Sequence, residues 1–129
     1  MTPVEFRRHL HRHPELSFRE TESARFIAEA LREAGIPCRP IAGTGVLAKI
    51  EGRGDLRRAV VLRADIDALP IREQSGAAWS SENDGVMHAC GHDIHAAVLY
   101  GTLLRLSAER NFELSLIHIS EPTRPEPIS

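Results

Sequence analysis

The 129-residue chain is long enough for one domain with a hydrophobic core, and its apolar (42%) and charged (26%) contents exclude disordered and collagen-like classes. No apolar run approaches the roughly 18 residues of a membrane span, and the N-terminus lacks the apolar core of a signal peptide. A net charge of -2 with scattered arginines argues against nucleic acid as the main partner. Two cysteines, Cys38 and Cys90, are too few for a disulfide framework, so we expect a soluble cytoplasmic protein.

Two helices are predicted in the first third of the chain. The first spans residues 3–13, because Thr2 can cap its N-terminus and Glu5, three positions later, completes a capping box. The second spans about residues 21–34, where apolar side chains recur at helical spacing and Gly35 follows as a C-terminal stop. Local signals therefore mark the start of the first helix and the end of the second.

Two strands are predicted next. Residues 46–50 and 59–62 are short, apolar and bounded by turn residues, which is typical of β-strands. Residues 52–55, Gly-Arg-Gly-Asp, form the turn between them, so the sequence predicts an antiparallel hairpin. Residues 69–89 are polar and irregular, and a stretch of this length without regular structure is usually functional or mobile.

A third helix is predicted from about Asp93 to Arg110. Its apolar side chains cover most of the helix circumference, so we expect it to be largely buried; they are Ile94, Val98, Leu99, Leu103, Leu104 and Leu106. A strand, a loop and a buried helix make the first half of a βαβ unit, whose partner strand should lie beyond Glu113.

The C-terminal segment, residues 114–129, resembles a translated sequencing adapter. Its first part reads Leu-Ser-Leu-Ile-His-Ile-Ser-Glu-Pro-Thr-Arg, which a transposase adapter encodes in order. A natural proline-rich linker is the alternative, and the run of consecutive matching codons disfavours it. We therefore expect residues 1–113 to belong to the native domain, and residues 114–129 to be a non-native, disordered tail without a place in the fold.

The densest group of metal-binding residue types lies in residues 88–95, His-Ala-Cys-Gly-His-Asp-Ile-His. Hydrolytic metal sites use nitrogen, sulfur and oxygen ligands with one position open for water. Cys90 and His92 flank Gly91, so the backbone can fold tightly and present both side chains to one ion. The alternative is a buried structural cysteine with surface histidines, which short motifs of this kind often represent.

A second group of candidate residues follows the strand at 59–62. Asp65 and Asp67 come where this apolar strand ends, and they share a face if the strand continues. The alternative is an ion pair with Arg63 and turn formation before Pro70. Three histidines alternate along the first helix, His9, His11 and His13, and a solvated helix face is the better interpretation there.

Three stretches, residues 8–18, 62–70 and 87–95, together resemble the metal-dependent amidohydrolase and peptidase family of aminoacylases, hippurate hydrolases and indoleacetyl-amino-acid hydrolases. The resemblance is strongest to the bacterial N-acyl-amino-acid amidohydrolase branch. It implies an α/β fold in which residues 1–113 are the N-terminal part of a three-layer α/β/α two-metal hydrolase domain. It also implies hydrolysis of the amide bond of N-acyl or aryl-acyl amino acids by metal-activated water.

The resemblance assigns roles to three residues. Cys90 and His92 match metal ligands of a site for two divalent ions, with Zn or Mn expected and Co or Ni as further candidates. Asp65 matches a catalytic aspartate that supports a metal-binding histidine in related branches, where this chain has Arg63. The general base and the remaining ligands are expected beyond residue 113, so the fragment alone should be inactive.

The resemblance also implies a set of partners. We expect a small-molecule N-acyl amino acid as substrate, neither nucleic acid nor membrane, and a homodimer formed through a domain absent from this chain. Two alternatives from other classes remain open. One is a non-catalytic metal-binding module built on Cys90 and His92, and the other is a thiol enzyme with Cys90 as nucleophile and His92 as base.

Overall fold

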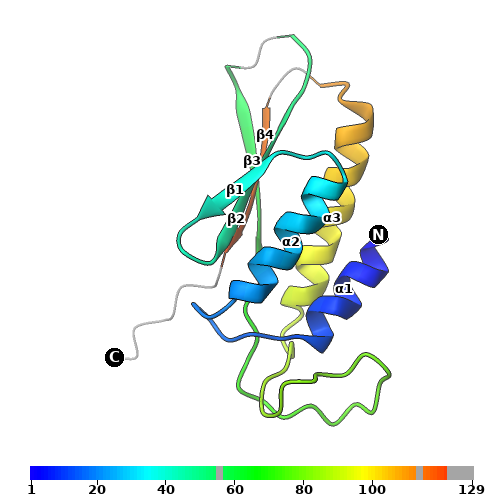
Figure 1. The fold of residues 1–129 in the computed structure, drawn as a ribbon. Coiled ribbons are helices and arrows are strands. Elements are labelled where there is room, and N and C mark those ends of the chain that lie inside the picture. Colours follow the sequence, from blue (N-terminus) through cyan, green and yellow to red (C-terminus); the bar gives the residue numbers. More distant parts are fainter. Residues whose placement is uncertain (55–56, 113–114, 122–129) are drawn as a thin grey trace.

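The computed structural model describes residues 1–54, 57–112 and 115–121. A four-stranded sheet with the order β1-β2-β4-β3 carries three helices on one face (Figure 1). The α/β class is thus confirmed, and the described residues supply the sheet and one helical layer of the expected three-layer arrangement. No helix of the described residues is long and apolar enough to cross a membrane.

The first two helices form where their capping signals predict. Helix α1 spans Pro3–Arg12, and the Thr2 hydroxyl accepts a hydrogen bond from the Glu5 N–H at 3.1 Å. Helix α2 spans Thr21–Glu33 and ends before Gly35, whose φ of +76° lies in the left-handed region that glycine adopts without strain.

The four strands are β1 (Cys38–Ile41), β2 (Gly45–Glu51), β3 (Ala59–Asp65) and β4 (Ser115–Glu121). Strand β2 pairs antiparallel with β1 and β4, while β3 pairs parallel with β4. The predicted hairpin of residues 46–50 with 59–62 is therefore wrong, because β4 lies between those two strands. Strand β1 was not predicted; it contains a proline, which an edge strand tolerates because its outer N–H groups need no partner.

Strand β4 also corrects the expectation for residues 114–129. That segment was expected to be a disordered tail, but Ser115–Glu121 pairs with both β2 and β3 along its whole length. Its alternating apolar and β-branched residues suit a strand, and the slot between β2 and β3 offers it hydrogen-bonding edges on both sides. Residues 114 and 122–129 lie outside the described residues, and the adapter origin of the segment stays a prediction.

Helix α3 spans His92–Glu109 and connects β3 to the parallel strand β4, so a βαβ unit is present. Its partner strand lies within residues 115–121, which the prediction had excluded from the fold. It packs against the sheet and against α1, and Tyr100 stacks on Phe6 with ring centroids 4.4 Å apart. The helix was expected to be largely buried through its apolar residues, which is wrong for Ile94 and Val98. These side chains are 48% and 62% exposed because they face away from the sheet and α1.

The core lies between the sheet and the helices. It contains the buried apolar side chains of all three helices and of β2, together with neighbouring loop residues: Phe6, Leu10, Ile27, Ala30, Leu31, Ile36, Val46, Ala48, Ile50, Ile66, Ala96, Ala97, Tyr100 and Leu103. Burial on this scale is the dominant stabilising contribution, and it fixes the position of α3 on the sheet. The N-terminus of α3 thereby comes to lie beside the C-terminal end of β3.

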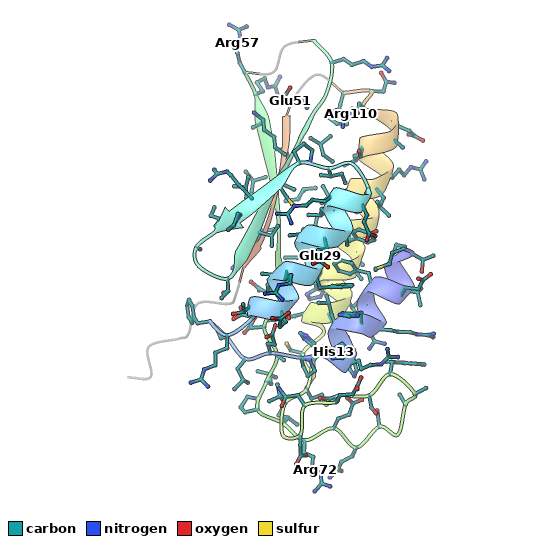
Figure 2. The ribbon with its side chains drawn as sticks, in the orientation of Figure 1. His13, Glu29, Glu51, Arg57, Arg72 and Arg110 are labelled. Carbon is teal, nitrogen blue, oxygen red and sulfur yellow. The ribbon has the colours of Figure 1, made fainter. Side chains whose placement is uncertain are left out.

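The long loop between β3 and α3 is held against α1. The Glu82 N–H donates to the Arg12 carbonyl at 2.8 Å, and the Asn83 amide donates to the Pro14 carbonyl at 3.1 Å. The Arg8 guanidinium lies 4.0 Å from the centre of the Trp79 ring. Figure 2 shows the end of α1 facing this loop, with Arg72 at the loop's outer edge. The loop is therefore tied down at several points.

Candidate metal site at the start of α3

The structure brings the two predicted aspartates to one histidine. Strand β3 ends at Asp65, and the buried Ile66 and Asp67 follow it into the loop. Asp67 Oδ1 lies 2.9 Å from His92 Nδ1, and Asp65 Oδ2 lies 3.8 Å from His92 Nε2. Both carboxylates thus reach the same imidazole although the strand does not continue.

The Asp67 contact fixes the orientation of His92. A carboxylate oxygen only accepts hydrogen bonds, so His92 Nδ1 donates to Asp67, whose backbone carbonyl oxygen also lies 3.0 Å away. In the neutral ring, Nε2 then carries the free lone pair. A metal-binding histidine is typically held by such a carboxylate behind its other nitrogen. The resemblance matched Asp65 to an aspartate that supports a histidine at the position of Arg63, and the hydrogen bond between His92 and Asp67 was not predicted.

Asp65 itself has a second neighbour. Arg63 Nη1 lies 2.7 Å from Asp65 Oδ1, so the ion pair considered from the sequence is present. The Asp65 side chain is 22% exposed and that of Arg63 is 43% exposed, which leaves the pair accessible to water. The other oxygen, Oδ2, faces His92 Nε2. The ion pair and the approach to His92 are therefore compatible.

Cys90 lies two residues before His92, on the turn that opens α3. Its thiol is exposed and free, and Gly91 between the two has a φ of +93°, a backbone conformation that few other residues adopt. This left-handed turn at the N-cap lets the chain reverse between Cys90 and His92. Thiolate and imidazole are donors that suit zinc and related divalent ions.

Cys90 and His92 are donors of a suitable type for a metal ion, but two donors are too few to hold one. Across residues 1–54, 57–112 and 115–121, no group of three or more histidine, cysteine, aspartate or glutamate side chains is arranged to hold an ion. A hydrolytic zinc site uses three protein ligands and an open position. Cys90 and His92 can therefore supply part of a shell, and the residues described here do not complete it.

His88 lies two residues before Cys90 in the chain. It is 3% exposed, and neither ring nitrogen has a hydrogen-bond partner within the described residues. Burial lowers the pKa of His88 to about 4, and the nearby His11 and His92 act in the same direction. The ring is consequently neutral at neutral pH. Its position in a motif of metal-binding residue types was visible from the sequence, but its burial was not.

His11 corrects the interpretation of the α1 histidines. A solvated face was expected, yet His11 is 4% exposed and lies between Asp93 and Glu73. A signal existed in the sequence, because Arg7 and His11 are four residues apart and share one helix face. Two basic groups together on a face that turns inward require a carboxylate partner, which Asp93 provides.

A carboxylate completes this buried cluster. Glu73 lies in the long loop with its side chain 5% exposed. Burial by itself would raise the pKa of Glu73, but hydrogen bonds from the Ser75 hydroxyl, the Ser81 N–H and His11 together lower it to about 2. Glu73 is therefore ionised at neutral pH beside His11.

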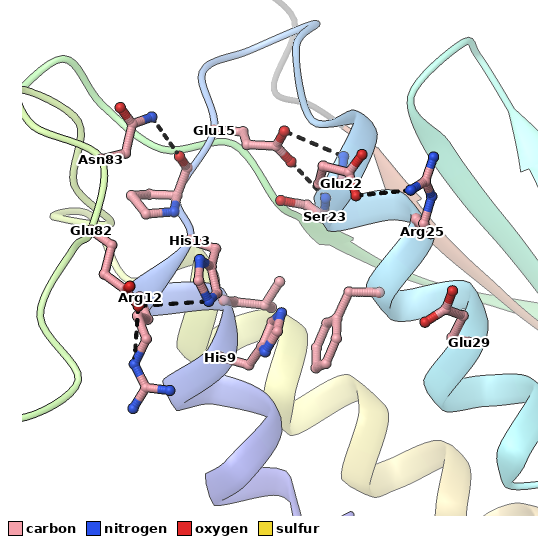
Figure 3. A pocket seen from close by; sticks show the side chains of 13 residues that line it. His9, Arg12, His13, Glu15, Glu22, Ser23, Arg25, Glu29, Glu82 and Asn83 are labelled. Carbon is pink, nitrogen blue, oxygen red and sulfur yellow. Dashed lines mark hydrogen bonds and ion pairs between the residues drawn. The ribbon is translucent and has the colours of Figure 1, made fainter.

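A separate pocket of about 500 Å³ lies between α1, α2 and the loop (Figure 3). His9, stacked on Phe26 at 3.8 Å between ring centroids, forms one wall. Glu15 forms another part and accepts hydrogen bonds from the N–H groups at the start of α2. Asp65, Cys90 and His92 do not line this pocket. The pocket and the candidate metal site are therefore in different places.

Comparison with known proteins supports the resemblance. The model of peptidase family M20/M25/M40 matches residues 61–122. The chain is 49% identical over 109 residues to the N-acetyl-L-cysteine deacetylase of Bacillus subtilis, covering 84% of this chain and 26% of that protein. It is 48% identical over 100 residues to the N-acyl-L-amino acid amidohydrolase of Geobacillus stearothermophilus, covering 77% and 27%. The chain thus spans about a quarter of the length of these curated relatives.

A solved structure agrees with the sequence comparison. The YXEP protein of Bacillus subtilis, described as a dinuclear metal-binding peptidase from the M20 family, superimposes with a TM-score of 0.89 and 43% identity. The match covers 94% of this chain and 35% of that one. Fold, sequence and the motifs at residues 8–18, 62–70 and 87–95 agree: residues 61–122 match the model of peptidase family M20/M25/M40, and the chain is similar in sequence and fold to members of that family.

Proposed function

We propose that the intact protein hydrolyses the amide bond of N-acyl or aryl-acyl amino acids, with Cys90 and His92 as ligands in a site for two divalent ions. The observation that carries this proposal is the hydrogen bond of 2.9 Å from His92 Nδ1 to Asp67, which leaves Nε2 free to bind a metal. The named relatives, a deacetylase and an amidohydrolase of acylated amino acids, support the substrate class.

Each residue of the site has a distinct role in this proposal. Cys90 and His92 bind the ion, Asp67 orients the imidazole through its Nδ1, and Asp65 presents a carboxylate 3.8 Å from the other ring nitrogen, Nε2. When bound, divalent ions polarise the amide carbonyl and lower the pKa of a water molecule so that it can attack. Thiolate and imidazole together favour Zn, with Mn as a further candidate.

Residues outside this chain are needed for the proposed reaction. The chain alone should not turn over substrate, because the described residues contain no group of three metal-binding side chains. The general base and the other ligands would come from a part of the protein beyond residue 113. We further propose a cytoplasmic location and a homodimer, consistent with the two unpaired cysteines but resting on the family resemblance.

A metal-exchange experiment on the intact protein tests this function. The protein is stripped with a chelator, reloaded with Zn²⁺ or Mn²⁺, and assayed for release of amino acid from N-acetyl and N-benzoyl amino acids. Asp67→Asn should weaken metal binding by about 10–100-fold, so that activity falls at limiting metal and returns at excess metal. Asp84→Asn, an exposed aspartate of the same loop, is the matched control and should change neither value.

Two outcomes would contradict the proposal. Tight metal binding without hydrolysis of any N-acyl amino acid would favour the non-catalytic metal-binding module. Labelling of Cys90 by a thiol reagent at the same rate with and without metal would exclude the thiolate as a ligand, and it would favour the thiol enzyme. Activity that needs metal, together with protection of Cys90 by metal, is the expected result.

A further inference from the structure

The turn that carries Cys90 is positioned by side chains rather than by regular structure. The backbone from residue 66 to residue 91 contains only isolated bridges, one of them between Leu69 and Met87. A loop without a hydrogen-bonded ladder depends on its contacts with rigid elements, through backbone or side chains, to keep a fixed shape. The contacts of the loop with α1 are therefore the place to look for what holds the turn.

His11 on α1 makes the most buried of these contacts. Its Nδ1 lies 2.8 Å from Asp93 Oδ2, and its Nε2 lies 3.0 Å from Glu73 Oε2. The three side chains are 6%, 1% and 5% exposed. Both partners present carboxyl oxygens to the ring, so the two nitrogens of His11 link Asp93 on one side to Glu73 on the other.

The two partners of His11 hold the two sides of the candidate site. Asp93 is the residue after His92 in the first turn of α3, and Arg7 also donates to its Oδ2 at 2.8 Å. Glu73 accepts the Ser81 N–H at 2.7 Å and thereby organises the loop that leads to Cys90. One imidazole thus connects α1 both to the turn with His92 and to the segment with Cys90.

We propose that His11 is a positioning residue for the metal site, holding the Cys90 thiolate and the His92 imidazole in the arrangement that one ion requires. This inference rests on the proposed function, in which Cys90 and His92 bind metal. Ligand side chains must be held within about 0.5 Å of the productive geometry, and the groups behind them typically change metal affinity by about 10–100-fold. His11 acts through Asp93 and Glu73 and does not touch the ion.

Three substitutions of His11 separate its contact with Asp93 from its contact with Glu73. His11→Asn places an amide near the former Nδ1 and keeps the contact with Asp93, while His11→Gln places it near Nε2 and keeps the contact with Glu73. His11→Ala removes both. His13→Ala removes a histidine of the same region whose ion pair with Glu82, at 3.8 Å, is exposed on both sides and contributes little.

Each variant of the intact protein is measured in three ways. Co²⁺ is titrated while the thiolate-to-cobalt charge-transfer absorbance reports binding by Cys90. Hydrogen exchange of the Ser81 amide, recorded without metal, reports whether Glu73 still accepts its hydrogen bond from the Ser81 N–H. Thermal unfolding records global stability. A merely structural role would lower the midpoint temperature of unfolding and leave the Co²⁺ affinity of the folded protein unchanged.

We expect His11→Ala to weaken Co²⁺ binding by at least about tenfold, with the asparagine and glutamine variants between it and the wild type. Ser81 exchange should accelerate in the alanine and asparagine variants, stay slow in the glutamine variant, and stay slow in His13→Ala. Should the alanine variant not fold, the two amide variants decide. Unchanged Co²⁺ affinity in both amide variants, or Ser81 exchange that is the same in both, overturns the inference.

The two proposals fail in different ways. A wild-type protein that shows no thiolate band with Co²⁺ refutes the proposed function, and with it the assignment of His11 to a metal site. A normal band in the wild type that is equally strong in all His11 variants refutes the role of His11 alone. Unequal Ser81 exchange without metal still measures the connection through Glu73 in either case.

Discussion

Glu20 offers a sharp test of how burial controls charge in this fold. Its side chain is 0% exposed at the start of α2, and neither carboxyl oxygen makes a hydrogen bond of good geometry within the described residues. Burial raises the pKa of Glu20 to about 7, and the negative charges of Asp67 and Glu15 add to the rise. The nearby backbone N–H groups of Arg19 and Glu20 only partly oppose it. Glu20→Gln is the perturbation, because glutamine keeps the shape and never ionises.

The size of the effect follows from the shift of the pKa. A rise from 4.5 to about 7 corresponds to roughly 3 kcal/mol, at about 1.36 kcal/mol per unit. Because the folded state holds its proton more tightly than the unfolded state, stability from this group is fully present below about pH 4.5 and is lost as the pH rises through 7. The free energy of unfolding of the variant minus that of the wild type should therefore grow with pH, by roughly 3 kcal/mol in total.

Urea unfolding at pH values from about 5 to 8.5 measures this difference. Glu29→Gln, on an exposed position of the same helix, is the matched control, and its difference from the wild type should be the same at every pH (Figure 2). A flat profile for Glu20→Gln would refute the reasoning, since it would mean that Glu20 ionises in the folded protein as easily as in the unfolded chain.

Three further predictions concern local features. Thr2→Ala should cost about 1 kcal/mol in urea unfolding, because the Glu5 N–H loses its acceptor; an unchanged value would show that α1 does not need this cap. Gly91→Ala should cost about 1–2 kcal/mol through backbone strain alone, since a β-carbon at this position meets no atom within 4 Å, and Gly91→Asn should cost less. Glu73→Gln should lower stability at neutral pH by roughly 3 kcal/mol, because the depressed pKa of Glu73 stabilises the fold above about pH 4.5. That deficit should disappear as the pH falls toward 2, and acid unfolding followed by circular dichroism would show whether it does.

Local features of the fold could be predicted from the sequence because their causes lie within a few residues. Thr2 and Glu5 make a cap by their spacing, and Gly35 ends α2 because it accepts a positive φ. The connection of β3 through α3 to a parallel strand was also predictable, since a strand, a loop and an apolar helix in this order favour a βαβ unit. The residue types of Cys90 and His92 made them candidate metal ligands, but a structural cysteine with surface histidines stayed an alternative until the family resemblance was taken into account.

Only the tertiary structure decided which strands are neighbours. Any two strands can pair through their backbone N–H and C=O groups. The sequences of residues 46–50 and 59–62 are therefore compatible both with a hairpin and with pairing to a third strand between them. The choice depends on β4, which follows α3 far along the chain and takes the slot between them. Strand order is a property of all the strands together, and a short window of sequence does not contain it.

The same distinction separates the parts of the candidate site. Asp65, Cys90 and His92 could be nominated from their residue types, whereas the contact of His92 with Asp67 depends on where α3 packs against the end of β3. The burial of His11 has the same origin, because its partners Asp93 and Glu73 are more than sixty residues away in the chain. Residue types along the chain nominate the side chains that could bind a metal. Tertiary packing selects the side chains that hold them in place, since hydrogen bonds and burial depend on distances in space rather than on spacing along the chain.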